Sequence, residues 1–264
     1  MLSIFIPNFA GTIVMILEMK NRIKRLLQLL LGYHNYLFVF ALWIISTLRF
    51  QRKEKDFIYF VKMISDNGIL LDVGANLGVM SYYLATRKPN SIIYSFEPVP
   101  ENIATMRKII RLFRLKNVRV MEMALGDQNT NIEMVLPEEN KVRFHGLSHV
   151  VHDSILEFNE GRKITVPMRR LDGMDVFSLS KYFVNGIKLD VENFEYFVLK
   201  GAHLLLHRHR PIVYAELWDN ENRQKCFDLM DGYGYEVNVL MSNKLVPFDK
   251  KIHQKQTFFF VPED

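Results

Sequence analysis

The chain has 264 residues, 49% of them apolar, and a formal net charge of +5. This length suits one α/β domain with a sizeable core and about fifty further residues, and is short for two full domains. The single cysteine, Cys226, excludes an internal disulfide and a Cys-rich zinc site, so a cytoplasmic location is the simplest expectation.

The positive charge is confined to the N-terminal region. Residues 1–56 contain eight Lys or Arg and three Asp or Glu, whereas residues 57–264 contain 26 of each sign. A region without net charge gives no indication of nucleic-acid binding. We therefore expect an N-terminal helical extension over 1–56 and an α/β domain over 57–264.

Two basic clusters, at 20–25 and 49–55, flank an apolar stretch at 26–48. Its longest uninterrupted apolar run, Tyr36 to Ile45, has ten residues, and a membrane-spanning helix needs about 18 to 20. Three interpretations remain open: a helix packed against the domain, a helix that contacts an anionic membrane surface through residues 20–55, and a true span. The second would place the protein at the inner face of the membrane.

From Phe57 onward, short β-rich runs alternate with longer helical stretches, which predicts a parallel sheet with crossover helices. The expected strands are 69–73, 91–96, 118–123, 132–136, 164–168, 186–190, 211–216, 235–240 and 257–261. The expected helices are 79–87, 100–114, 194–207 and 221–231. A turn is expected at 124–127 and a polar loop at 137–163, and Pro247 breaks the connection between the last two strands.

The first predicted strand ends in Asp72-Val73-Gly74-Ala75-Asn76-Leu77-Gly78, a glycine-rich turn that opens a helix. Such a turn places backbone N–H groups and the helix N-terminus over a pocket. Gly74 and Gly78 let the backbone approach a ligand closely. Asn76 stands where a dinucleotide-binding turn has its second glycine, so a pyrophosphate would fit badly. Asp72 and Asn76 are expected to bind a neutral or cationic group instead.

Acidic residues also follow the next two predicted strands. Glu97 lies 19 residues after Gly78, at the spacing at which a carboxylate binds both hydroxyls of a ribose. Asp127 follows the third strand, where it can meet the amino group of an adenine. These two residues indicate a nucleoside-binding site at the carboxyl edge of the sheet.

A further acidic group follows the strand at 186–190. Asp190 and Glu192 share a face if the strand continues through Val191, and either is a candidate for catalysis or substrate contact. Alternatively, one of them caps the helix that begins near Phe194. Glu195 is expected in the first turn of that helix, and Glu216 ends the following strand.

The polar loop contains three histidines that are further candidates for a general base. The alternative is that they are ordinary surface histidines, and no metal ligands are assigned to them. They are His145, His149 and His152.

Six motifs resemble, in their order along the chain, those of FkbM-type methyltransferases over about residues 57–240. They are Asp-Val-Gly-Ala-Asn-Leu-Gly (72–78), Phe-Glu-Pro (96–98), Ala-Leu-Gly-Asp (124–127), Arg-Leu-Asp (170–172), Ile-Lys-Leu-Asp-Val-Glu (187–192) and Leu-Lys-Gly-Ala (199–202). The resemblance implies an α/β class I methyltransferase (Rossmann-like) fold, with helices on both faces of a seven-stranded, mostly parallel sheet whose last strand is antiparallel. Asn193 stands where the family commonly has glycine, and asparagine tolerates left-handed backbone angles better than most residues.

The resemblance also implies transfer of a methyl group from S-adenosylmethionine to a hydroxyl oxygen. We expect Asp190 and Glu192 to be catalytic. The expected cofactor-binding residues are Asp72, Gly74, Asn76, Gly78, Glu97 and Asp127, and no metal site is expected.

The expected acceptor is a sugar hydroxyl of a glycan or glycolipid, because of the breadth of the family and the basic, apolar N-terminus. Alternatives are a secondary-metabolite hydroxyl, a non-catalytic cofactor-binding scaffold at the membrane and, more distantly, a NAD-dependent oxidoreductase. The oligomeric state stays open.

Overall fold

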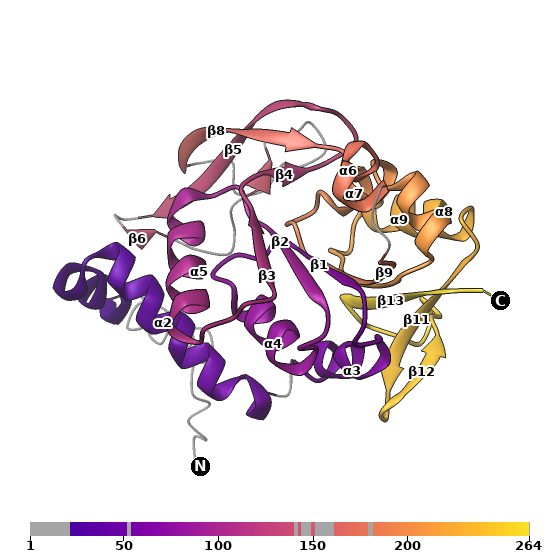
Figure 1. The fold of residues 1–264 in the computed structure, drawn as a ribbon, viewed down its shortest axis with the longest axis horizontal. Coiled ribbons are helices and arrows are strands. Elements are labelled where there is room, and N and C mark those ends of the chain that lie inside the picture. The colour runs from indigo at the N-terminus through magenta and orange to yellow at the C-terminus, as the bar shows by residue number, and fades with distance from the viewer. Residues whose placement is uncertain are drawn as a thin grey trace, which may run out of the picture.

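The computed structural model describes residues 22–51, 54–139, 142–143, 149–150, 161–178 and 182–263 (Figure 1). In this part of the chain, the strands form one eight-stranded sheet and a smaller five-stranded sheet. The helices lie on both faces of the larger sheet, as Figure 1 shows.

The larger sheet has the strand order β12-β11-β13-β10-β9-β1-β2-β3. Its strands are β1 (Ile69–Val73), β2 (Ile92–Phe96), β3 (Val118–Met121), β9 (Val184–Leu189), β10 (Ile212–Glu216), β11 (Tyr235–Met241), β12 (Lys244–Pro247) and β13 (Thr257–Pro262). The five strands from β3 to β10 are parallel, and β13 runs antiparallel to both of its neighbours. This is the order of a class I methyltransferase, extended by the edge strand β12.

Strand order reverses beside β1, because the chain passes from β1 to β2 on one side and returns to β9 on the other. Loops at the carboxyl ends of β1 and β9 therefore diverge and leave a crevice between them. Ligands of open α/β sheets bind at such a crevice.

The helices divide between the two faces of this sheet. The main-domain helices are α3 (Lys55–Met63), α4 (Val79–Arg87), α5 (Pro100–Leu112), α6 (Asp175–Ser178), α7 (Glu195–Lys200), α8 (His203–His209) and α9 (Glu221–Asp231). Leu70 and Phe259 pack against α3 and α4 on one face, whereas Leu71, Phe258 and Phe260 pack against α7, α8 and α9 on the other. Alternate side chains of a strand point to opposite faces, so each strand contributes to both cores.

The smaller sheet lies at the top of Figure 1 and has the order β4-β8-β5-β6, with β7 also paired to β5. Its strands are β4 (Ala124–Leu125), β5 (Thr130–Glu139), β6 (Val142–Arg143), β7 (His149–Val150) and β8 (Gly161–Arg169). The predicted turn at 124–127 was wrong in part, because Ala124 and Leu125 pair with Met168 and Arg169. Strands β5 and β8 also extend into the predicted polar loop from both sides.

The predicted helix 194–207 was also wrong, because two helices, α7 and α8, occupy this segment. Gly201 interrupts them where the chain passes against the backbone of Gly126 and Asp127, so closely that a β-carbon on Gly201 would overlap the carbonyl of Gly126. Asp172 supports the second helix, since its Oδ1 accepts a 3.1 Å hydrogen bond from the Leu205 N–H. The Arg-Leu-Asp and Leu-Lys-Gly-Ala motifs therefore meet at this break.

The N-terminal extension contains helix Arg22–Leu31 and α2 (Tyr33–Thr47), followed by the short helix η1 (Leu48–Phe50). Helix α2 packs against α5 and α4 in a cluster of buried apolar side chains that includes Leu37, Leu77 and Val79. Its attachment includes a 3.2 Å hydrogen bond from the Tyr83 hydroxyl to the Ile45 carbonyl. The extension therefore shares a core with the domain that follows it.

Among the described residues, no single helix has the length and apolar composition to cross a membrane. Helix Arg22–Leu31 and α2 meet the criteria of length and composition only as a pair, and the pair is bent by 117°.

Candidate active site

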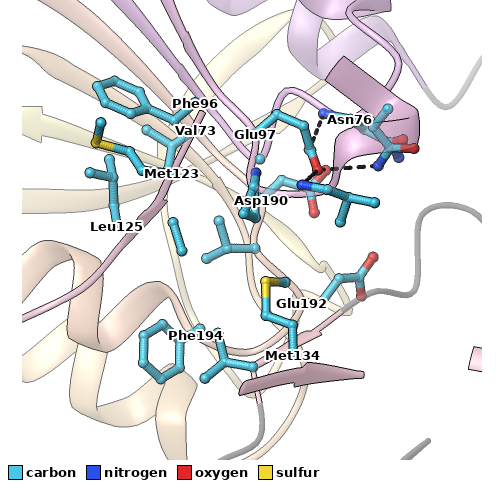
Figure 2. A pocket seen from close by; sticks show the side chains of 17 residues that line it. Val73, Asn76, Phe96, Glu97, Met123, Leu125, Met134, Asp190, Glu192 and Phe194 are labelled. Carbon is cyan, nitrogen blue, oxygen red and sulfur yellow. Dashed lines mark hydrogen bonds between the residues drawn. The ribbon is translucent and has the colours of Figure 1, made fainter. Parts of the chain in front are cut away.

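A pocket lies where β1, β2 and β9 end, at the crevice between β1 and β9 (Figure 2). Its lining includes Val73 of β1, Phe96 of β2 and Asp190, which follows β9. Figure 2 shows Phe96, Met123 and Leu125 at one end, and Asn76 and Glu97 at the other. The pocket thus has an apolar end and a polar end.

Residues of the smaller sheet form one wall of the pocket. Met134 of β5 and Val150 of β7 line it, together with Ala124 and Leu125 of β4. Phe194 completes this wall from the loop after β9. The apolar side chains among these residues suit contact with an aromatic ring.

The loop 72–78 depends on its two glycines. Gly74 has φ +75°, and a β-carbon there would overlap the carbonyl of Asp190. Gly78 has φ +83° and lies against the side chain of Met106. Both positions combine a left-handed backbone with a close contact, so only glycine fits.

Glu97 is buried at the polar end of the pocket. Its carboxylate accepts hydrogen bonds from Asn76 N at 2.7 Å, Val99 N at 2.9 Å and Asn102 Nδ2 at 3.2 Å. A carboxylate has about four acceptor positions, so these donors leave about one for a ligand hydroxyl. Burial raises the pKa of Glu97 to about 7, against the opposing effect of the three donors.

Asn76 lies beside Glu97 and also has a left-handed backbone, with φ 49°. Asn76 lines the pocket, and its buried side-chain oxygen has no hydrogen-bond partner among the described residues. A buried acceptor without a partner is costly. This oxygen therefore marks a position where a ligand donor would be favourable.

Lys188 is the main residue of the site that the sequence analysis did not assign. It is buried near the carboxyl end of β9, and its Nζ donates a 2.9 Å hydrogen bond to the carbonyl of Gly74. The same ammonium lies 3.3 Å from Asp190 Oδ2 and 3.5 Å from Asp72 Oδ1. Burial lowers its pKa, but the two carboxylates outweigh this effect and hold the pKa above its ordinary value. A lysine inside an apolar strand next to Asp190 was the available signal.

Three of the predicted cofactor residues are not among the described residues that line the pocket: Asp72, Gly78 and Asp127. Asp72 is fully buried behind the loop, where its Oδ2 accepts a 2.6 Å hydrogen bond from Ser81 Oγ. Asp127 forms an ion pair with Lys200 at 2.8 Å. The other three, Gly74, Asn76 and Glu97, line the pocket together.

Asp190 and Glu192 both line the pocket, but not for the reason given by the sequence analysis. Strand β9 ends at Leu189, and Glu192 and Asn193 have φ values of 53° and 74°. The two carboxyl groups therefore meet through a left-handed turn, not through strand alternation. Neither caps α7, whose N-cap residue forms no side-chain cap hydrogen bond.

Two carboxyl groups of this turn have raised pKa values. The pKa of Glu192 rises to about 8 because of burial and the nearby carboxylates of Asp190, Glu195 and Glu216. Glu195 lies in the first turn of α7, as predicted, and accepts a 2.9 Å hydrogen bond from Val191 N. Burial raises its pKa to about 8 as well.

Asn193 adopts the expected left-handed conformation, and its side chain holds the turn against α9. Its Oδ1 accepts hydrogen bonds from Asn220 Nδ2 at 2.8 Å and from Asn222 Nδ2 at 3.2 Å. Asn222 Nδ2 also lies 3.1 Å from the Asn193 carbonyl. The asparagine therefore forms side-chain contacts that a glycine could not.

The histidines of the predicted loop cannot be placed in this site. His145 and His152 lie outside the described residues, and so does the side chain of His149. Among the residues that the structure describes, no group of three His, Cys, Asp or Glu side chains is suited to hold a metal ion.

Comparison with known proteins shows two similar fungal methyltransferases. "Methyltransferase 1" of Beauveria bassiana is 25% identical over 161 residues, which cover 55% of this chain and 63% of that protein. "Methyltransferase sdnD" of Sordaria araneosa is 25% identical over 211 residues, 69% of this chain and 79% of that protein. The chain thus spans less than two thirds of the length of the first relative.

Two solved structures are also similar. A methyltransferase FkbM from Methylobacillus flagellatus aligns with a TM-score of 0.49 and 14% identity, over 76% of this chain and 47% of that one. A SAM-dependent O-methyltransferase from Thermotoga maritima aligns with a TM-score of 0.45 and 11% identity, over 84% and 72%.

The family model for the methyltransferase FkbM domain matches residues 72–237. The match begins at the loop that lines the pocket and includes β9, the turn that follows it and α9. It covers well over half of the chain. The chain therefore belongs to the methyltransferase FkbM domain family.

Proposed function

We propose that this protein transfers a methyl group from S-adenosylmethionine to a hydroxyl oxygen, on a sugar of a glycan or glycolipid. The charge of the pocket carries the proposal. Glu97, Asp190 and Glu192 line it, and no Lys or Arg is among its described lining residues. A sulfonium cofactor with an amino group suits such a lining, whereas the pyrophosphate of NAD would meet carboxyl groups and no lining Lys or Arg.

The residues present fit this cofactor. Phe96, Met123 and Leu125 would hold the adenine at the apolar end, and Glu97 would accept from a ribose hydroxyl. The unpartnered oxygen of Asn76 would accept from the amino group of the methionine part. The sulfonium supplies an electrophilic methyl carbon.

Glu192 would act as the general base in this reaction. An alcohol must lose its proton to attack the methyl carbon, and a base is most effective when its pKa lies near the working pH. The pKa of about 8 for Glu192 meets this condition. Asp190, held by Lys188 at 3.3 Å, would accept a hydrogen bond from the acceptor and orient it for in-line attack.

The sugar acceptor is supported by a second cleft, which lies where β10 ends and β13 begins. Its lining includes Glu54, Asp56, Glu216, Asp219, Gln254, Gln256 and Phe248. The buried hydroxyl of Tyr214 also lines it, and burial followed by Glu54, Asp56, Glu216 and Asp190 raises the pKa of Tyr214 well above its ordinary value. These carboxyl groups thus gather near one hydroxyl. Carboxylate and amide groups with an aromatic ring suit a molecule rich in hydroxyls.

Two measurements test the proposal. Calorimetric titration with S-adenosylhomocysteine should show saturable binding and NAD should show none; binding of NAD alone would overturn the cofactor assignment. Glycan and glycolipid fractions incubated with isotope-labelled S-adenosylmethionine should then gain one labelled methyl group on a sugar. If the label is found on a hydroxyl that does not belong to a sugar, the acceptor is a secondary metabolite.

Two variants test the catalytic roles of Glu192 and Asp190. The variants Glu192→Gln and Asp190→Asn should lose transfer while they still bind S-adenosylhomocysteine. Full biological function in both variants would instead indicate a non-catalytic scaffold.

A further inference from the structure

Helix Arg22–Leu31 carries apolar side chains that the described structure leaves uncovered. None of its residues is buried, and Leu29 and Leu30 are 74% and 72% exposed. Ile23, Leu26 and Leu27 are exposed as well. A contiguous exposed apolar surface of this kind marks a place where another molecule binds.

Helix α2 and η1 also carry exposed apolar side chains. One face of α2 packs on the domain through Leu37 and Ala41, whereas Val39, Trp43 and Phe50 are exposed. Trp43 has 57% of its surface exposed. Tryptophan combines an apolar ring system with one N–H donor, and it is enriched where lipid headgroups meet hydrocarbon.

The charge of this segment indicates which molecule covers it. Arg22, Lys24 and Arg25 are the charged residues between 22 and 47, and no Asp or Glu occurs there. Two parallel copies of the helix would bring like charges into contact, and two antiparallel copies would offer these charges no acidic partner. An anionic lipid surface offers hydrocarbon for the leucines and, directly above it, negatively charged headgroups for the basic residues.

The geometry indicates how the segment would lie on lipid. Helix Arg22–Leu31 is about 15 Å long at 1.5 Å per residue, half of the roughly 30 Å of a hydrocarbon core. It meets α2 at a bend of 117°. We propose that helix Arg22–Leu31 and the exposed face of α2 bind in the plane of an anionic bilayer surface, with the leucines in the outer hydrocarbon and the basic residues at the headgroups.

The contact would orient the catalytic domain, because α2 is not a free linker. Leu37 of α2 shares a buried cluster with Leu77 of the loop 72–78 and Val79 of α4. The site is therefore held in a defined position relative to the membrane. This arrangement suits an acceptor presented at the surface of a bilayer.

The test is co-sedimentation of the full chain with vesicles of phosphatidylcholine containing 30% phosphatidylglycerol, and with vesicles of phosphatidylcholine alone. The double variant L29E/L30E should lower the partition coefficient for the anionic vesicles at least tenfold. The variant L204E/I252E, which adds the same two charges at exposed apolar positions elsewhere, should bind like wild type. Wild type should also bind the neutral vesicles at least tenfold more weakly.

Circular dichroism and titration with S-adenosylhomocysteine would show that each variant is folded. The proposal is overturned if L29E/L30E partitions like wild type, or if both double variants lose binding equally. It is also overturned if the protein is a dimer without lipid and L29E/L30E makes it monomeric, because a second copy would then cover the leucines.

Discussion

The ammonium of Lys188 donates a 2.9 Å hydrogen bond to the carbonyl oxygen of Gly74 and thereby connects β9 to the loop that follows β1. These two strands flank the crevice where the sheet order reverses. The same ammonium lies between the carboxylates of Asp72 and Asp190. One buried cation thus holds the loop, its buried acid and a candidate catalytic acid in a single arrangement.

Replacing Lys188 with methionine should destabilise the protein by about 3 to 5 kcal/mol, because buried carboxylates would lose their cation. Urea denaturation would measure the loss. Lys200→Met is a suitable control, since Lys200 is half exposed and pairs with Asp127 at the surface. Its removal should cost about 0 to 1 kcal/mol. Equal losses in the two variants would contradict a structural role for Lys188.

The affinity for S-adenosylhomocysteine should weaken as the pH falls below about 7, the pKa of buried Glu97. Protonation removes the charged acceptor for a ribose hydroxyl, so the Kd should rise by up to about tenfold per pH unit. Calorimetry between pH 5.5 and 7.5 would follow this change. Glu97→Gln should bind more weakly and show little pH dependence. A wild-type Kd that stays constant over this range would exclude the assigned role of Glu97.

The rate of methyl transfer should rise with pH up to about 8, where Glu192 becomes ionised. Glu192→Gln should lower kcat/KM by about 10² to 10⁴ and remove this rise. Asp190→Asn should lower kcat/KM but keep the pH dependence, because Glu192 would still titrate. If Glu192→Gln kept the rise toward pH 8, the general base would be another group.

The buried carboxyl group of Glu195 should cause the free energy of unfolding to fall as the pH rises from about 4.5 to about 8. Its pKa is raised by burial, so the folded state holds a proton that the unfolded state has released. The slope for one such group is about 1.4 kcal/mol per pH unit. Glu195→Gln keeps an acceptor for Val191 N, and its free energy of unfolding should therefore vary less with pH in this range. Parallel profiles for wild type and variant would refute the raised pKa.

The sequence predicted well those elements whose limits are set by local residues. The bounds of β1, α4 and α9 agree with the predictions, because each apolar run ends at a glycine, a polar turn or a helix cap. The loop 72–78 and Glu97 were recognisable because the chemistry of a nucleoside site depends on residue types at fixed spacings. For these elements and site residues, the neighbouring residues in the sequence were sufficient for a correct prediction.

Other features depend on contacts between distant parts of the chain. The break at Gly201 arises from its approach to Gly126, and the strand at Ala124 and Leu125 exists because β8 pairs with it. The position of Lys188 was visible in the sequence, but two of its partners, the Asp72 carboxylate and the Gly74 carbonyl, come from the end of β1, more than 110 residues earlier in the chain. Periodicity within one element carries no information about such partners.

Asn193 stands where the family commonly has glycine. Two substitutions separate the contribution of its side-chain hydrogen bonds from the cost of its left-handed backbone. Asn193→Ala should be destabilising, because it removes the side-chain acceptor for the amides of Asn220 and Asn222 and keeps a β-carbon at φ 74°. Each lost hydrogen bond costs about 0.5 to 1.5 kcal/mol. Asn193→Gly loses the same hydrogen bonds but adopts the left-handed angle freely, so it should be about 1 kcal/mol more stable than the alanine variant. Urea denaturation of both would measure the difference. If the glycine variant equals wild type, the contacts to Asn220 and Asn222 add no stability; if it equals the alanine variant, backbone strain at this turn is negligible.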